Sequence, residues 1–64
     1  MKRDFNKLMN EINKNKKINI YGVTNPYFEN NMWYWYDETY SPSKPYFTRD
    51  EALIELTNYV NYYL

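Results

Sequence analysis

The apolar positions of the first segment repeat with the period of a helix. They follow the spacing i, i+3, i+4 and i+7, which forms one narrow stripe: Phe5, Leu8, Met9 and Ile12. Asp4 suits the positive end of the helix dipole, and Asn15 is a candidate left-handed cap at the other end. We therefore predict an amphipathic helix over residues 2–15, packed through this stripe on the core.

The middle of the chain has a strand pattern that is apolar on both faces. Met32 to Tyr36 are five bulky residues in a row, which favours an extended backbone. Alternation along a strand over residues 32–39 places Trp33 and Trp35 on one face and Met32, Tyr34 and Tyr36 on the other. One face can serve the core. The other needs a cover, which can be more of this chain, a second copy or a foreign partner.

Lys17 to Val23 also alternates and predicts a strand, with Ile18, Ile20 and Gly22 on one face. Gly22 is the only glycine in the chain. Within a strand, a glycine indicates either a bulge or the close approach of a large ring. A tryptophan of the central strand would fill that space.

The segments on either side of the central strand contain turn signals. Residues 24–31 are a connection marked by Asn25-Pro26 and Asn30-Asn31. Tyr27 and Phe28 within it either form a short strand of their own or close one edge of the core, and we favour the second. After the central strand, Pro42 and Pro45 interrupt regular structure, and Tyr46-Phe47 can add a short edge strand.

The last helix has the clearest local signal. Thr48 to Glu51 is a capping box, with Thr48 as N-cap and Glu51 at N3. Phe47 and Ala52 stand where a hydrophobic staple forms. The helix is predicted to run to about Tyr63 with one broad apolar face: Ala52, Leu53, Leu56, Tyr59, Val60 and Tyr63.

These elements predict a single small α+β domain over residues 1–64. It has two layers: an antiparallel sheet of two or three strands, and an N-terminal and a C-terminal helix on its tryptophan face. Open sheet edges favour a homodimer. The predicted core is Phe5, Leu8, Met9, Ile12, Ile18, Ile20, Trp33, Trp35, Phe47, Leu53, Leu56 and Val60.

The amino-acid composition limits the kinds of chemistry that the chain can carry out. The chain lacks cysteine and histidine, which excludes disulfides, thiolate metal sites and the commonest general base. Asp37 and Glu38 are neighbours on a strand, so they point to opposite faces and cannot act as a carboxylate pair. A divalent site from Glu29, Asp37 and Glu38 is conceivable, but its spacing matches no calcium loop. We expect no enzyme activity, no metal and no cofactor.

Charge is unevenly distributed in a chain whose formal net charge is zero. Residues 1–17 hold six basic and two acidic residues, a net charge of +4, and residues 18–64 hold two basic and six acidic residues, a net charge of −4. This polarity can orient a partner or pair two copies, or both faces are simply solvated. The basic helix face could also meet phosphates or acidic lipid. No targeting signal or membrane-spanning run is visible, so a cytoplasmic location is expected.

Nucleic-acid binding is one functional hypothesis, because exposed tyrosines on a sheet can stack bases. The stretch Phe47 to Leu53 resembles the junction of last strand and helix in AP2-type domains and phage integrase arms. That resemblance implies DNA reading by a basic sheet. Here the central strand ends in Asp37-Glu38, and phosphate contacts supply most non-specific affinity, so such a sheet is a poor DNA reader.

Protein binding fits the residues best, since tyrosine and tryptophan are enriched at interface hot spots. The predicted binding surface is an aromatic face with an acidic rim: Tyr21, Tyr34, Tyr36, Asp37, Glu38 and Tyr40. We expect a non-catalytic inhibitor or adaptor, encoded by a phage or mobile element, that occludes a site on a host protein in the host cytoplasm (an anti-defence function). The alternatives are a nucleotide or single-stranded nucleic-acid binder using the same tyrosines, and tyrosines that only complete a core.

Overall fold

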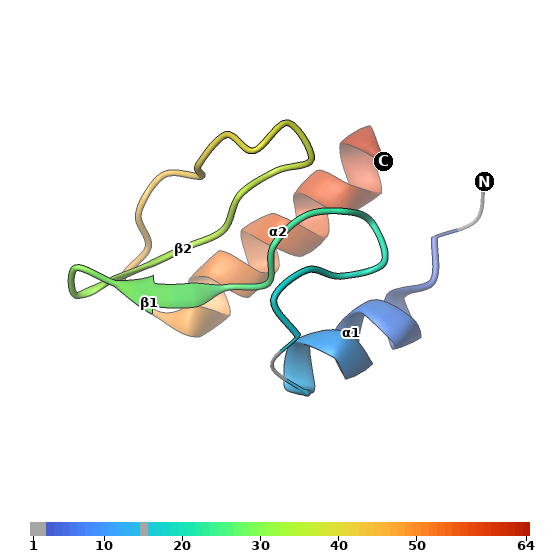
Figure 1. The fold of residues 1–64 in the computed structure, drawn as a ribbon, viewed down its shortest axis with the longest axis horizontal. Coiled ribbons are helices and arrows are strands. Elements are labelled where there is room, and N and C mark those ends of the chain that lie inside the picture. Colours follow the sequence, from blue (N-terminus) through green and yellow to red (C-terminus); the bar gives the residue numbers. More distant parts are fainter. Residues whose placement is uncertain (1–2, 15) are drawn as a thin grey trace.

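The computed structural model describes residues 3–14 and 16–64 as two helices and one β-hairpin (Figure 1). The order is α1 (Phe5–Asn13), β1 (Tyr27–Glu29), β2 (Met32–Tyr34) and α2 (Arg49–Tyr63). This is the small α+β fold that the sequence predicts, with an antiparallel sheet of two strands. In Figure 1, α2 lies behind the hairpin and α1 lies beside the long connection that leads into β1.

Helix α1 is shorter than predicted, and its buried stripe is narrower. Asp4 is the N-cap, and its carboxylate accepts a hydrogen bond of 3.0 Å from the backbone N–H of Lys7. Leu8 and Ile12 are fully buried, whereas Met9 lies at the edge of the stripe and is exposed, which corrects its assignment to the core. The predicted cap at Asn15 lies outside the described residues.

Helix α2 confirms the predicted capping box. The Thr48 hydroxyl accepts from the backbone N–H of Glu51, and the Glu51 carboxylate accepts from the backbone N–H of Thr48, both at 3.1 Å. Ala52, Leu56 and Val60 form its fully buried face. Phe47, predicted in the core, is 80% exposed. Ala52 is too small and too deeply buried to hold the Phe47 ring in a hydrophobic staple.

Removing this cap has a measurable cost. Thr48→Ala leaves the Glu51 backbone N–H without its acceptor, and we expect it to lower the free energy of unfolding by about 1 kcal/mol. Thr48→Ser keeps the hydroxyl and is the matched control. Urea unfolding followed by circular dichroism gives both values, and equal values for the two variants would contradict the capping role.

The hairpin register is set by two left-handed asparagines. Asn30 and Asn31 have φ angles of 51° and 64°, which is typical of a two-residue type I′ turn. The turn pairs Tyr27 with Tyr34, Phe28 with Trp33 and Glu29 with Met32. Tyr27 and Phe28 therefore form a strand of their own, and our preference for an edge of the core was wrong.

Strand β2 ends at Tyr34, earlier than the predicted strand over residues 32–39. On its other edge β2 makes a single bridge, Trp33 with Tyr46, and past its end Tyr36 makes another with Pro42. The backbones of Trp33 and Tyr46 exchange hydrogen bonds of 2.8 and 2.9 Å. Prolines at 42 and 45 lack the N–H groups that a longer ladder needs, so the predicted edge strand at Tyr46-Phe47 is reduced to one bridge.

Residues 17–23 are not a strand, contrary to our prediction. Ile18 and Ile20 are exposed, and the polar Asn19 is buried instead. Asn19 donates through Nδ2 to Oδ1 of Asn25 at 2.9 Å and accepts from the backbone N–H of Tyr21 at 2.9 Å. Backbone bonds of 3.0 Å from Asn19 to Val23 and from Asn25 to Lys17 join these side-chain bonds, and together they fold the segment into a closed loop.

Gly22 serves this loop through its backbone conformation. Its φ of 80° lies in the left-handed region, and outside its two chain neighbours no described residue has an atom within 4 Å of the position that a Cβ would take. The close approach of a tryptophan ring that we considered is therefore wrong.

The core lies between α1 and α2 on one side and the inner faces of the loop after α1 and of the hairpin segment on the other. Its buried members are Leu8, Ile12, Val23, Trp35, Tyr46, Ala52, Leu56 and Val60. Phe5, Trp33 and Leu53 pack against it as half-buried residues, in line with the prediction. Two arginines connect the helices: Arg3 Nε donates to the Val60 carbonyl at 3.0 Å, and Arg49 donates to the Ile12 carbonyl at 3.5 Å. Over residues 3–14 and 16–64, neither helix has the length and apolar character needed to cross a bilayer.

Candidate aromatic binding site

Four tyrosines form a continuous row, which we call the tyrosine ladder: Tyr27, Tyr34, Tyr36 and Tyr40. The ring centroids of Tyr27 lie 6.1 Å from Tyr34 and 5.9 Å from Tyr36, and the last pair is nearly parallel with an interplanar angle of 8°. Tyr40 stacks on Tyr36 at 4.9 Å. Burial, with a further contribution from neighbouring Tyr36, raises the pKa of Tyr27.

Local structure explains the ladder. The hairpin register places Tyr27 directly opposite Tyr34, and Tyr36 follows two residues later on the same side. A turn after Tyr36 then reverses the chain and places Tyr40 beside the Tyr36 ring. In this turn Oδ1 of Asp37 accepts from the backbone N–H groups of Thr39 at 2.9 Å and Ser41 at 3.0 Å. Tyr40 itself has a φ of 62°, a left-handed conformation within this turn.

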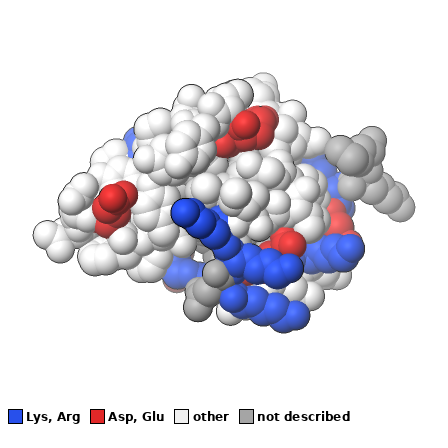
Figure 2. Space-filling view, in the orientation of Figure 1, with Lys and Arg blue, Asp and Glu red and all other residues white. Residues whose placement is uncertain are grey.

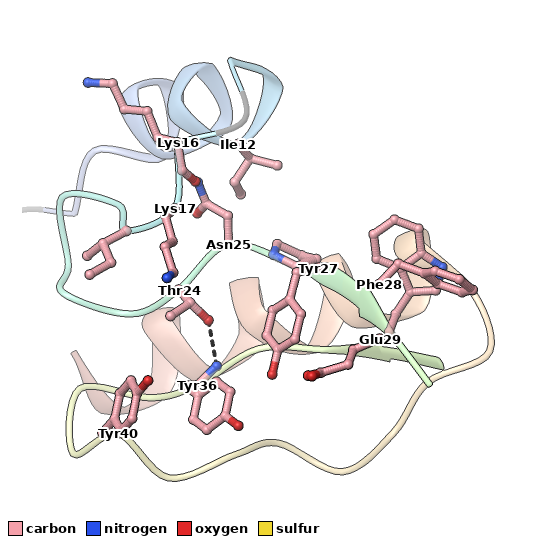
Figure 3. A pocket seen from close by; sticks show the side chains of 13 residues that line it. Ile12, Lys16, Lys17, Thr24, Asn25, Tyr27, Phe28, Glu29, Tyr36 and Tyr40 are labelled. Atoms are coloured by element: carbon pink, nitrogen blue, oxygen red, sulfur yellow. Dashed lines mark hydrogen bonds between the residues drawn. The ribbon is translucent and has the colours of Figure 1, made fainter. Parts of the chain in front are cut away.

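A groove of about 930 Å³ runs between the ladder and the loop after α1 (Figure 3). Its volume lies at the upper end of the range that ligand pockets span. A hydrogen bond of 2.6 Å from the Tyr36 backbone N–H to the Thr24 hydroxyl joins its two walls. The lining residues are Ile12, Lys16, Lys17, Ile18, Thr24, Asn25, Pro26, Tyr27, Phe28, Glu29, Trp33, Tyr36 and Tyr40.

The charge beside the groove is mainly basic. Lys16 and Lys17 line it, with Glu29 as the one acidic residue in the lining. Lys16 also forms an ion pair with Glu11 at 3.6 Å. Figure 3 shows the Lys17 side chain pointing toward Thr24. Figure 2 shows lysine and arginine gathered over α1 and the segment after it, while the hairpin side of this face is largely uncharged.

The structure brings together three of the four predicted tyrosines. Tyr34, Tyr36 and Tyr40 share the ladder, but Tyr21 lies elsewhere. Tyr21 packs against the core, and its hydroxyl accepts a hydrogen bond from the backbone N–H of Asp4. Tyr27 was missed by sequence reasoning. The Asn30-Asn31 turn was the signal that could have found it, because a two-residue turn places Tyr27 opposite Tyr34.

The two predicted acidic residues are both engaged inside the chain. Hydrogen bonds from Thr39, chiefly its hydroxyl, and from the Ser41 backbone lower the pKa of Asp37. The Glu38 carboxylate accepts a hydrogen bond from the Tyr59 hydroxyl of α2. In this arrangement both residues position the ladder loop, and the cations of Lys16 and Lys17 border the groove. Whether Asp37 or Glu38 contacts a partner stays a prediction.

The Glu38–Tyr59 bond has a testable pH signature. The hydrogen bond, followed by burial, raises the pKa of Tyr59 from 10.0 to about 12. Because the folded value lies above the unfolded one, this contribution to stability is fully present below pH 10 and is lost as the pH rises toward 12. We expect Glu38→Gln to bring the Tyr59 pKa back toward 10.

The Cζ chemical shift of Tyr59, followed by NMR from pH 8 to 12.5, measures this change. Tyr62, another tyrosine of α2, is exposed and serves as the internal reference. An unchanged Tyr59 titration in Glu38→Gln would show that the bond does not control it.

The described residues contain no group of three or more aspartates and glutamates placed to hold a metal ion. No family model matches the chain, and neither the curated proteins nor the solved structures yield a similar protein.

Proposed function

We propose that this chain is a small, non-catalytic protein-binding module that acts by occluding a site on its partner. The observation that carries the proposal is the tyrosine ladder beside a groove of about 930 Å³. Tyrosine supplies a large contact area with little conformational entropy to lose, and it keeps a polar hydroxyl for the rim of an interface.

The accessible anchors are the outer members of this surface. Tyr40 is 76% exposed at the end of the ladder, and Phe28 is 58% exposed on β1. Tyr27, Tyr34 and Tyr36 are half-buried and stacked on one another, so they form a preorganised platform. A partner segment that fills the groove would desolvate Tyr40 and Phe28, and Lys17 would meet an acidic group on it.

Two further parts of the proposal concern setting and assembly. We propose a phage or mobile-element inhibitor that acts on a host protein in the cytoplasm. The chain lacks histidine and cysteine, and it is rich in Asn, Lys, Ile and Tyr, amino acids whose codons are rich in A and T. We also propose that the chain can pair as a homodimer, since the outer edge of β1 has no strand partner among the described residues, whereas the edge of β2 is bridged by Tyr46. Light scattering across a dilution series measures the mass, and a persistent dimer that buries Tyr40 would leave the groove unavailable to a foreign partner.

The partner test uses two exposed anchors and one exposed control. Tyr40→Ala and Phe28→Ala remove groove anchors, whereas Phe47→Ala removes an equally exposed ring that does not line the groove. We expect quantitative capture from host lysate to retain specific proteins with Phe47→Ala and to lose them at least tenfold with either groove variant. Proteins captured equally by all three variants would contradict the proposal.

Nucleotide or single-stranded nucleic-acid binding is a second candidate, favoured by Lys16 and Lys17 in the same groove as Tyr40. Two lysine–phosphate contacts would give a log–log salt slope of about −1.4, a loss of about sevenfold in affinity between 50 and 200 mM salt. Fluorescence anisotropy with a labelled thymidine 12-mer tests this. Salt-sensitive binding that Tyr40→Ala abolishes would favour this candidate over a protein partner.

A further inference from the structure

A second aromatic site lies between α2 and the Trp35 region, and it shares no lining residue with the groove. It is a pocket of about 330 Å³, small enough for one side chain. Five aromatic rings, one carboxylate and one amide line it, and we call it the aromatic cage: Trp35, Tyr46, Glu55, Asn58, Tyr59, Tyr62 and Tyr63.

The cage rings are inclined to one another, unlike those of the Tyr27–Tyr36 pair. Trp35 and Tyr59 lie 5.2 Å apart between centroids at an angle of 53°, and Tyr59 and Tyr63 lie 4.9 Å apart at 38°. Tyr62 and Tyr63 meet edge to face at 61°. None of these three ring pairs is stacked in parallel.

The cage is a shallow hollow that opens widely to solvent. Trp35 and Tyr46 are buried and form its inner part, while Tyr62 and Tyr63 are exposed at its mouth. The hydrogen bond between Tyr59 and Glu38 anchors the middle ring from outside the cage. The site is therefore built from residues of α2 and from the core residues Trp35 and Tyr46.

The charge at the cage is negative. Glu55 is half-buried in the lining, and Asn58 Nδ2 donates to its Oε2 at 3.3 Å, which holds the carboxylate in place. Burial, followed by the charge of Glu55, raises the pKa of Tyr46. The chain's own Lys44 already lies 5.9 Å from the Tyr46 ring centroid, within reach of a cation–π contact.

We propose that the aromatic cage binds a guanidinium group, as presented by an arginine side chain. Tyrosine and tryptophan faces attract cations, and the Glu55 carboxylate is the charge complement that a cation requires on leaving water. A guanidinium fits both features at once, because its plane stacks on a ring while its N–H groups donate to a carboxylate. A neutral or anionic ligand would offer Glu55 no opposite charge.

The test uses a cation and its neutral isostere on the intact chain. Trp33→Phe leaves Trp35 as the only indole, so its fluorescence reports on the cage. We expect N-acetyl-arginine amide to give a saturable change with a dissociation constant in the low millimolar range, as suits a ligand of this size. N-acetyl-citrulline amide, equal in shape but uncharged, should bind at least tenfold more weakly. Sodium chloride titrations correct for ionic strength.

Variants assign the effect to the cage. Glu55→Gln should weaken arginine-amide binding about tenfold. Asp50→Asn removes an acidic residue of the same helix that does not line the cage, and it should change nothing. Tyr40→Ala should also bind normally, which separates this site from the groove and from the proposed function.

If Trp33→Phe unfolds, the indole N–H resonance of Trp35 in the unmodified chain serves as the reporter. Equal binding of citrulline and arginine amides would overturn the proposal. Tighter binding of tetramethylammonium than of arginine amide would also overturn it, because the cage would then select a quaternary ammonium.

Discussion

Leu56→Ala is expected to remove a large part of the free energy of unfolding at 25 °C. Leu56 is fully buried in the middle of α2, between the buried Ala52 and Val60. Truncating such a leucine costs about 2.7–5 kcal/mol, through lost transfer free energy and the cavity that remains. A chain of 64 residues has a total stability of only about 3–10 kcal/mol, so this one change removes much of it.

The matched control lies two residues away on the same helix. Ile54 is 60% exposed, so Ile54→Ala removes little buried surface and slightly improves helix propensity. We expect its free energy of unfolding to stay within about 0.5 kcal/mol of the original. Urea unfolding monitored at 222 nm compares the two. Similar losses in both variants would contradict the assignment of the buried face of α2.

Asn25→Asp is expected to cost about 2–4 kcal/mol, although it changes only one side-chain atom. Asn25 is buried, its Nδ2 donates to the Lys16 carbonyl, and its Oδ1 accepts from Asn19 at 2.9 Å. A carboxylate keeps the acceptor but places a second acceptor against the Lys16 carbonyl. The buried charge and the lost donor both disfavour the closed loop of residues 16–25.

Asn6→Asp makes the same chemical change at an exposed position in the first turn of α1, where a negative charge suits the helix dipole. We expect no loss of stability there. Thermal unfolding of both variants at pH 7 gives the comparison. An Asn25→Asp protein as stable as Asn6→Asp would show that the buried amide does not close the loop.

The elements with complete local signals were predictable from the sequence. The capping box at Thr48 and Glu51 fixed the start of α2, because both hydrogen bonds depend only on residues within one turn. The spacing of Leu8 and Ile12 likewise located α1. In each case the spacing of residues in the sequence and the contacts in the structure depend on the same geometry within one or two helical turns.

Residues 17–23 were mispredicted because the alternation of Ile18 and Ile20 resembles a strand. The structure buries Asn19 and Asn25 instead, and the bond between them spans six residues. The preferences of single residues for strand or loop do not predict a contact between two side chains six residues apart. Gly22 was a signal for this loop. The sequence alone does not distinguish a glycine with a left-handed φ in a loop from a glycine at a strand bulge.

The candidate site was predictable only in part, for the same reason. Tyr34, Tyr36 and Tyr40 are near one another in sequence and meet in the structure. Tyr21 was grouped with them through a strand that does not form, and it packs at the start of α1 instead. Tyr27 joins through hairpin register. The aromatic cage was not predicted, because Trp35 and Tyr59 meet only through tertiary packing.

The arginine contacts between the helices have a consequence for engineering. Arg3 reaches the last turn of α2, so the two ends of the described chain lie at the same end of the molecule (Figure 1). A short flexible linker could join them, and new termini could open in the exposed turn at Glu38-Thr39, at the cost of weakening the turn that returns Tyr40 to the ladder. Such a circular permutant would turn α1 and α2 into one continuous helical hairpin, which allows the groove to be redesigned from a free chain end.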